Sequence, residues 1–420
     1  FCCFIGHKSL VSVFFSYARQ DEDLRNELAK HLKILERQGI IDTWCDRDIQ
    51  AGSERAIEID ERLNEADIIL LLVSADFVAS DYCYDVELKR ALERHSHGEA
   101  RVIPIISRPL DWQNTPFGKL KVLPRNEKPI TQWDNRDEAF YDIAIGIRRS
   151  LEELFEAQKQ KQVNLYRALL KLGYRQQARL FRRAIASESV AAFLIHGLPE
   201  HGQRWLLNRL IVQYLPENLN SKDVVIGMTR LTRQTTVNAF WRELGGRVGI
   251  KKRKLTPTEV ADGVYDWWRT QDVILVFHHV EESPEDAIQR MIEEFWIPLA
   301  QRVQYPGTGD RRNKLLMFLV DYEGKAEDWE LPFVEKLDAA WKPHTPIKTP
   351  EIQEFTENEL MDWLDGEYSD LPPELTHGID DKVEEILDIS EGGIPELVLI
   401  EICDQCGLNW YEEKDKWLRL

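Results

Sequence analysis

Short apolar runs alternate with helical segments in the N-terminal third of the chain, and this alternation constrains the fold more than any other feature. The runs are rich in β-branched and aromatic residues, which predicts buried strands at 11–17, 40–44, 68–73 and 101–106. Between the first two runs, leucines recur at helical spacing from Leu24 to Leu35. Strictly alternating strands and helices predict an α/β fold, a doubly wound parallel sheet flanked by helices.

Length and composition narrow the class of protein. A chain of 420 residues with 43% hydrophobic side chains is expected to form two or three domains. Its 54 Lys and Arg against 73 Asp and Glu give a net charge of −19, which disfavours a general role in coating nucleic acid or anionic membranes. No apolar run approaches the ~18 residues that span a bilayer. We therefore expect a cytoplasmic protein without a membrane anchor.

Six cysteines lie scattered over the whole length, which is typical of a reduced protein rather than of a disulfide framework. Cys403 and Cys406 have the spacing of half a zinc site, but no second pair or histidine cluster follows them. We expect no bound metal.

Glu87 is the candidate catalytic residue of the N-terminal part. It lies seven residues after Ser80, in a segment predicted to open a helix just beyond the strand at 68–73. The carboxyl ends of such strands are where open α/β sheets bind ligands. At ~100° per residue, Glu87 falls beyond the edge of the apolar arc of this helix. Asp85, two residues earlier, points about 160° away from Glu87. The position of Glu87 favours a partly desolvated acid at the border of a cleft.

Four ordered motifs together resemble a bacterial-type TIR domain over residues 8–155. They are Phe14-Phe-Ser-Tyr17 with its acidic loop, Asp46-Arg-Asp-Ile-Gln-Ala-Gly52, the strand ending Leu72-Val-Ser74, and the segment from Ser80 to Glu87. The resemblance implies a flavodoxin-like fold. It also implies one of two activities, because some TIR domains cleave NAD+ and others are scaffolds that only associate with one another. In the enzymatic kind, the residue that matches the catalytic carboxylate is Glu87.

The chemistry of NAD+ explains how one carboxylate can suffice. Its nicotinamide is already a cationic leaving group, so cleavage of the glycosidic bond needs no general acid. A single carboxylate can stabilise the positive charge that develops on the ribose. We therefore expect NAD+ as the substrate, with no separate cofactor.

The resemblance also implies which residues surround the substrate. Tyr17 and Arg19 would follow the first strand and Trp44 would end the second, with Trp44 stacking on a base and Arg19 meeting the pyrophosphate. Asp46 belongs to the same set. The alternative interpretation makes Tyr17 and Trp44 core aromatics and Arg19 a surface charge, and the sequence leaves both open.

One position departs from the pattern of the enzymatic relatives. Many of them carry Trp four residues before the acid, whereas this chain has Cys83 there, with Tyr82 beside it. Tyr82 and Cys83 therefore complete the predicted substrate-binding set, and aromatic packing near the acid would fall to Tyr82 or Tyr84.

A second glycine loop follows the predicted strand at 191–195. Gly197 and Gly202 with the helix after them have the frame of a phosphate-binding P-loop. A working loop ends in Gly-Lys-Ser/Thr, which neutralises phosphate and holds Mg²⁺. Here Gln203 and Arg204 occupy those positions, and the strand at 273–277 ends in two histidines where acids would be. Nucleotide hydrolysis is therefore not expected. Another strand, 315–320, ends at Asp321, which is left as either the missing acid or a mere neighbour.

The C-terminal two thirds resemble a STAND nucleotide-binding module that has lost its catalytic residues. The segment 391–400 carries a Gly-Ile-Pro sequence similar to the Gly-x-Pro of the helical lid in that class. The predicted organisation is a TIR domain at 1–155, a helical linker at 156–190, a degenerate P-loop domain at 191–345 and a helical lid region at 346–420. The basic run at 251–254 is expected to be a solvated loop.

These patterns lead to one functional hypothesis and two alternatives. The hypothesis is an NAD+ glycohydrolase or cyclase, an effector of a bacterial immune system, which becomes active when the C-terminal module responds to an unknown trigger and TIR domains self-associate into a homo-oligomer. The first alternative is a non-enzymatic TIR scaffold or adaptor that assembles other TIR proteins. The second is a working nucleotide switch with an atypical loop.

Overall fold

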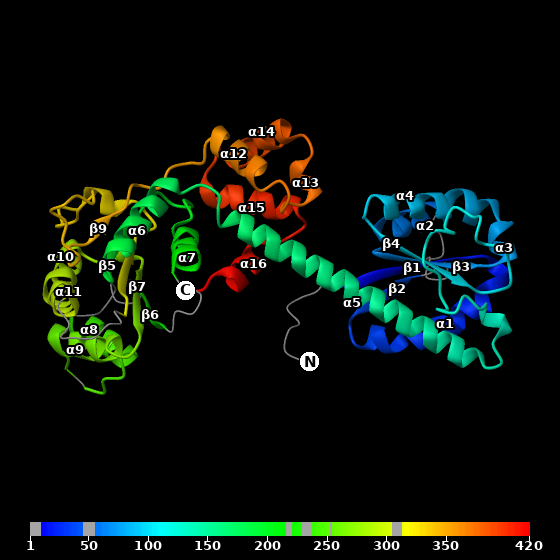
Figure 1. The fold of residues 1–420 in the computed structure, drawn as a ribbon, viewed down its shortest axis with the longest axis horizontal. Coiled ribbons are helices and arrows are strands. Elements are labelled where there is room, and N and C mark those ends of the chain that lie inside the picture. Colours follow the sequence, from blue (N-terminus) through cyan, green and yellow to red (C-terminus); the bar gives the residue numbers. More distant parts are fainter. Residues whose placement is uncertain (1–9, 45–54, 216–220, 229–236, 253, 305–312) are drawn as a thin grey trace. The chain divides into compact units, whose positions relative to one another are not determined.

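The computed structural model describes residues 10–44, 55–215, 221–228, 237–252, 254–304 and 313–420 (Figure 1). The chain divides into two compact units, Phe1–Gln158 and Lys159–Leu420. The predicted loop from Asp46 to Gly52 lies outside the described residues.

A four-stranded parallel sheet with the strand order β2-β1-β3-β4 forms the centre of the first unit. Its strands are β1 (Val11–Tyr17), β2 (Ile41–Trp44), β3 (Ile68–Val73) and β4 (Arg101–Ile106). The doubly wound parallel sheet predicted from the alternating pattern is confirmed.

Helices cover both faces of this sheet (Figure 1). On one face α1 (Glu22–Arg37) and the first turns of α5 (Arg136–Leu169) pack against Phe15 and its neighbours. On the other face, α2 (Arg55–Glu65) and α4 (Leu88–Ser96) pack against Phe14. The period of two along β1 sends successive side chains into different core clusters.

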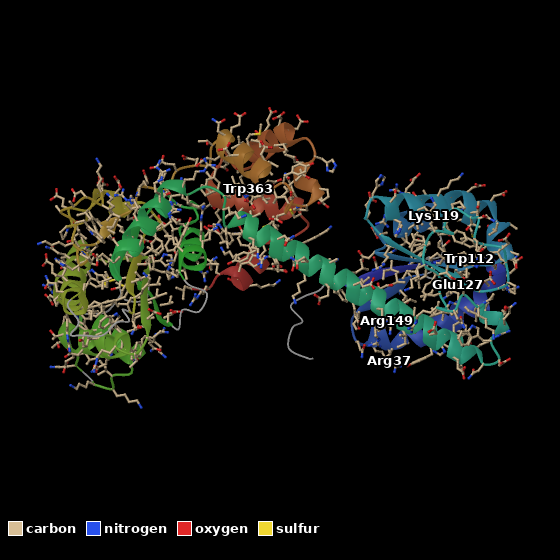
Figure 2. All side chains as sticks on the ribbon, in the orientation of Figure 1. Arg37, Trp112, Lys119, Glu127, Arg149 and Trp363 are labelled. Carbon is tan, nitrogen blue, oxygen red and sulfur yellow. The ribbon has the colours of Figure 1, made fainter. Side chains whose placement is uncertain are left out.

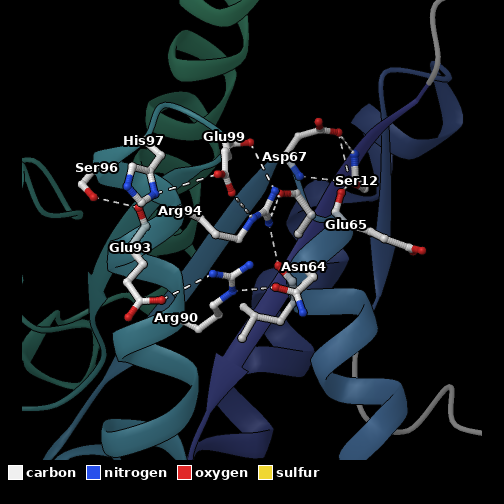
Figure 3. A network of polar contacts seen from close by, with 12 residues as sticks. Ser12, Asn64, Glu65, Asp67, Arg90, Glu93, Arg94, Ser96, His97 and Glu99 are labelled. Carbon is white, nitrogen blue, oxygen red and sulfur yellow. Dashed lines mark hydrogen bonds and ion pairs between the residues drawn. The ribbon is translucent and has the colours of Figure 1, made fainter. Parts of the chain in front are cut away.

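A polar network ties the loops at the amino ends of the strands (Figure 3). The guanidinium of Arg94 donates to the carbonyl oxygens of Leu63 at 2.6 Å and Ala66 at 2.7 Å. The backbone N–H of Ser12 donates to the Asp67 carboxylate at 2.8 Å. Side chains therefore fix this edge of the sheet, and the opposite edge holds the candidate site.

The second unit has a five-stranded parallel sheet with the order β6-β7-β8-β5-β9. Its strands are β5 (Val190–Ile195), β6 (Ser221–Gly227), β7 (Asp272–His278), β8 (Leu315–Val320) and β9 (Ile347–Lys348). One core cluster joins the sheet to α6 (Arg175–Ser187) and α7 (Gln203–Tyr214). The other joins it to α8 (Val237–Arg247), α9 (Pro257–Trp268) and α11 (Ile297–Gln304).

A helical cluster completes the second unit. It consists of α12 (Glu357–Gly366), α13 (Pro373–Thr376), α14 (Ile379–Ile389), α15 (Pro395–Gln405) and α16 (Trp410–Trp417). The indole of Trp363, labelled in Figure 2, donates to the carbonyl oxygen of Ala168 at 2.8 Å. Leu165 and Phe181 lie in the same core, so much of the segment predicted as a linker packs into this unit.

The described helices include none with the length and apolar character required to cross a bilayer.

Candidate functional site

Glu87 ends a π-helical turn, η3 (Tyr82–Glu87), which leads directly into α4. The predicted helix is present, but its first turn is π-helical, which bonds i to i+5 and is wider than an α-helical turn. The Glu87 side chain is buried, with 6% of its surface exposed, and it accepts a hydrogen bond from the hydroxyl of Ser16 on β1. A buried carboxylate therefore lies at the carboxyl end of a central parallel strand, where α/β folds bind ligands.

A second contact ties the same turn to β1. The Cys83 thiol is buried and donates to the carbonyl oxygen of Tyr17 at 3.6 Å. Tyr82 is 39% exposed. Asp85 faces solvent, where it forms an ion pair with Lys89 at 3.2 Å. Within one turn, the structure therefore separates a buried acid from an exposed one.

The two predicted aromatic residues lie against opposite faces of the sheet. Tyr17 packs on the α1 side, where the Arg25 guanidinium donates to its hydroxyl at 3.3 Å. Trp44 packs on the α2 side and stacks on Phe14, with their ring centroids 5.6 Å apart. One copy of this unit therefore does not bring Tyr17 and Trp44 together on one face. Arg19 is exposed at the start of η1 (Arg19–Asp21), and Asp46 lies outside the described residues.

Sequence reasoning missed a second buried acid at the same edge of the sheet. Asp21 has no exposed surface and accepts a hydrogen bond from the Ser74 hydroxyl, while Arg108 Nε lies 2.8 Å from its carboxylate. Arg108 also donates to the carbonyl oxygen of Gln20 at 2.7 Å. These residues follow β1, β3 and β4, so the network fixes the loops after three strands. A signal was present, since polar residues follow each of these strands in the sequence.

Burial raises the pKa of the Asp21 carboxyl above its ordinary value. The hydrogen bond from Ser74 and the charge of Arg108 act in the opposite direction. The network therefore keeps a desolvated acid close to its cation.

In the second unit, a side-chain amide occupies the glycine loop. Gln203 is 2% exposed, and its Nε2 donates to the carbonyl oxygens of Gly197 and Leu198, both at 2.8 Å. A lysine in this position of a working loop would project toward phosphate. Here the amide satisfies the carbonyl groups of the loop itself.

Gly202 is required by the close approach of Tyr174. Its φ of 69° is left-handed, and an added Cβ would overlap the Tyr174 hydroxyl. That hydroxyl donates to the carbonyl oxygen of His201 at 3.2 Å, and burial raises the Tyr174 pKa. The backbone N–H of Glu396 in α15 donates to the carbonyl oxygen of Glu200 at 2.9 Å. Contacts from α6 and α15 therefore close the loop.

The acid that follows β8 bonds within its own loop. Asp321 is fully buried, and its carboxylate accepts from the backbone N–H groups of Glu323 at 2.9 Å and Ala326 at 2.7 Å. His278 Nδ1 lies 2.7 Å from the Tyr322 hydroxyl. Burial, together with the positive charge of Arg204, lowers the pKa of His278 to about 4. The Asp321 carboxylate is thus occupied in capping its own loop, which favours the interpretation of Asp321 as a neighbour rather than a metal-binding acid.

The Cys403 thiol is buried and Cys406 is partly buried, and burial raises the pKa of both. Within the described ranges, no group of three His, Cys, Asp or Glu side chains gathers in a way that would hold a metal ion.

Comparison with known proteins finds one family match within each of the two compact units. Residues 13–143 match a family described as TIR domain, and residues 169–320 match one described as inactive STAND. The uncharacterized protein y4lF of Sinorhizobium fredii is 59% identical over 139 residues, which cover 33% of this chain and 43% of that protein. The chain thus spans less than half of the length of this curated relative.

Two solved structures are also similar to this chain. The TIR domain of a Toll-related receptor from Hydra magnipapillata is 28% identical, covers 25% of this chain and 78% of its own, and has a TM-score of 0.20. NtrX from Brucella abortus, solved in complex with ATP, is 12% identical over 95% of this chain and 83% of its own, with a TM-score of 0.28.

Proposed function

This chain carries a TIR domain followed by an inactive STAND domain, and we propose that the TIR domain cleaves NAD+ under the control of the second unit. The two domains are those of a TIR-domain signalling or defence protein. The proposed activity is that of an NAD+ glycohydrolase or cyclase in a bacterial immune response.

The buried carboxylate of Glu87 at the end of β1 carries this proposal. In the proposed reaction, the bond between the ribose anomeric carbon and the nicotinamide nitrogen breaks, and nicotinamide leaves as a neutral molecule with the bonding electrons. Glu87 stabilises the cationic ribose that remains, and this effect is stronger in a desolvated site. Water then adds to the anomeric carbon and loses a proton, or an adenine nitrogen adds to give a cyclic product.

The placement of the aromatic residues supports a requirement for assembly. Tyr17 and Trp44 lie on opposite faces of one sheet, and Glu87 is nearly covered. We propose that self-association of TIR domains opens the Glu87 turn and completes the substrate pocket with residues of a neighbouring copy. The isolated chain is then expected to be almost inactive.

A non-enzymatic scaffold is the second candidate, and the hydrogen bond from Ser16 to Glu87 favours it. A carboxylate that is 6% exposed and bonded to Ser16 can serve to hold η3 against β1. In that case the TIR domain only recruits other TIR domains, and the Glu87 carboxylate has a structural role alone.

The second unit is proposed to regulate without turning over nucleotide and without a metal ion. Gln203 occupies the glycine loop, and the Asp321 carboxylate is bonded to its own backbone. ATP turnover by the full chain that disappears in an Arg204→Ala variant would contradict this part of the proposal.

NAD+ consumption at matched oligomeric state tests the catalytic proposal. The full chain, fused to a domain that forces oligomerisation, is compared with its Glu87→Gln and Asp85→Asn variants. The Asp85 variant is a matched control, because this acid lies in the same turn but is exposed and paired with Lys89. We expect Glu87→Gln to lose activity and Asp85→Asn to retain it. Intact NAD+ with the forced wild-type oligomer would favour the scaffold, and equal activity in both variants would refute the assignment of Glu87.

A further inference from the structure

Residues 157–187 form a basic segment in an acidic chain. This stretch contains no Asp or Glu, although the whole chain has a net charge of −19. Its eight basic residues are Lys159, Lys161, Arg167, Lys171, Arg175, Arg179, Arg182 and Arg183. A local patch of this kind acts independently of the distant acids, because salt screens exposed charges beyond ~8 Å at physiological ionic strength.

Helix α6 presents four of these arginines on one exposed face. Residues on its other side, such as Phe181, pack into the core. Arg175 pairs with Asp362 at 3.0 Å, and Arg183 donates to the carbonyl oxygen of Leu337 at 3.1 Å. Arg179 and Arg182 make no ion pair or side-chain hydrogen bond with any residue that the structure describes. Like charges at this helical spacing repel one another and lower the stability of the helix. A bound anion would relieve this repulsion.

An open groove of about 710 Å³ follows this arginine face. Its helix side is lined by Arg175, Arg179 and Arg183, and its other side is formed by 350–356. A second cavity of about 650 Å³ shares Arg183 and continues past the end of α6. The two cavities therefore follow the length of the helix.

The three acids of the groove already have partners. Glu359 accepts from the backbone N–H of Thr356 at 3.1 Å, and Glu354 Oε1 lies 3.7 Å from Nε2 of His201. Glu351 accepts from the side-chain amide of Gln353 at 3.0 Å. Their charges reduce the positive potential of the groove, but they leave the guanidinium groups of Arg179 and Arg182 without carboxylate partners in the described part of the chain.

We propose that the α6 arginine face, defined by Arg175, Arg179, Arg182 and Arg183, binds the phosphates of a nucleic-acid strand. Arg175, Arg179 and Arg183 are four residues apart, which is ~6 Å per step along the helix axis. Phosphates of one strand advance ~3.4 Å each along a duplex axis, so about every second phosphate can face an arginine. A single phosphate or mononucleotide instead requires donors that converge on one point. Planar guanidinium groups suit phosphate oxygens because they can bind them through two hydrogen bonds.

This binding is expected to be independent of base sequence. In the first groove the aromatic side chains, Tyr174 and Phe355, are buried. In the second cavity Trp341 is half-buried, and its indole N–H donates to the carbonyl oxygen of Thr345. We therefore expect contacts to the phosphate backbone to dominate the affinity, which then depends strongly on salt.

Fluorescence anisotropy of a short labelled DNA duplex with the full chain tests the proposal over a range of salt concentrations. The double variant Arg179→Gln with Arg182→Gln removes two arginines that make no ion pair or side-chain hydrogen bond with the described residues, so the fold should survive. The matched control is Arg242→Gln with Arg290→Gln, which removes the same charge from exposed positions on other helices. We expect saturable binding by the wild type. We also expect the slope of log affinity against log salt to fall by about 1.8 in the α6 variant, since each phosphate contact with a duplex contributes about 0.9. The control should keep the slope of the wild type.

Four results would overturn the proposal. The first is no binding by the wild type at low salt, and the second is an equal loss in the control variant. The third is inorganic tripolyphosphate competing with the duplex at equal phosphate concentration, which would indicate a site for a small anion. The fourth is a change in sedimentation of the α6 variant without any duplex binding by the wild type, which would show that a second copy of the chain covers this face.

Discussion

The hydroxyl of Ser16 on β1 donates a hydrogen bond to the carboxylate of Glu87, 71 positions later in the chain. Both side chains are buried at the carboxyl edge of the first sheet. This bond fixes the candidate catalytic acid to a central strand rather than to a loop. A variant without this hydrogen bond keeps the acid and changes only how the acid is positioned.

Ser16→Ala should lower NAD+ cleavage by the forced oligomer without abolishing it, because Glu87 remains but loses one donor. Hydrogen bonds to charged groups contribute about 1.5–3 kcal/mol, so the free energy of unfolding should fall by a similar amount. Denaturant unfolding and the NAD+ assay measure the two effects. If Ser16→Ala matched the wild type in both measurements, the Ser16 hydroxyl would have no role in holding Glu87.

Arg108→Gln should destabilise the first unit, because it leaves the buried Asp21 carboxylate without its cation. The pKa of Asp21 is already raised above 3.8 by burial, and loss of Arg108 raises it further. The free energy of unfolding of the variant is therefore close to that of the wild type at acid pH, where Asp21 is protonated in both the folded and the unfolded state. The deficit should grow as the pH rises toward neutrality.

Arg125→Gln is the control for that prediction, since Arg125 pairs at 3.2 Å with Asp142, which is less buried than Asp21. Unfolding by urea at acid and neutral pH should show a smaller pH-dependent difference for this variant. A deficit of Arg108→Gln that did not change with pH would argue against a charged Asp21.

His278→Gln should make the free energy of unfolding of the second unit fall less steeply as the pH is lowered. Folding lowers the pKa of His278 from 6.5 to about 4, so the unfolded state binds the proton first as the pH falls. The stabilisation is present above pH 6.5 and is lost between that pH and about 4, with an upper bound of about 3 kcal/mol. Tryptophan fluorescence during unfolding at several pH values in this window measures the slope. Parallel slopes for variant and wild type would mean that His278 is not the titrating group.

Gly202→Ala should destabilise the second unit through two separable effects. An added Cβ overlaps the Tyr174 hydroxyl, and the left-handed φ of 69° costs a non-glycine residue about 1 kcal/mol. Adding Tyr174→Phe to the same chain should remove the overlap, because Phe has no hydroxyl. The free-energy cost of the left-handed backbone at position 202 should remain. A double-mutant cycle from thermal or urea unfolding gives the coupling energy, and strictly additive effects would show that the two groups do not meet.

The sequence by itself determined the parallel α/β class of both units and the replacement of the P-loop lysine, but it did not predict β6 or β9. Strands such as 11–17 and 68–73 were predictable because continuous apolar runs bounded by polar turns are a local signal. The replacement of the loop lysine by Gln203 was equally visible, since a motif is defined by residues that are close in the chain.

Only the tertiary structure decided how the site residues are placed. Pairing of Ser16 with Glu87, the Asp21 network and the opposite faces of Tyr17 and Trp44 depend on which strands neighbour each other and on a π-helical turn that shifts the side chains after it. A local sequence pattern predicts which helix or strand a residue belongs to and roughly which face of it the residue occupies. Contacts between residues distant in the chain form only in the folded core, where apolar side chains pack together and buried polar groups must find partners.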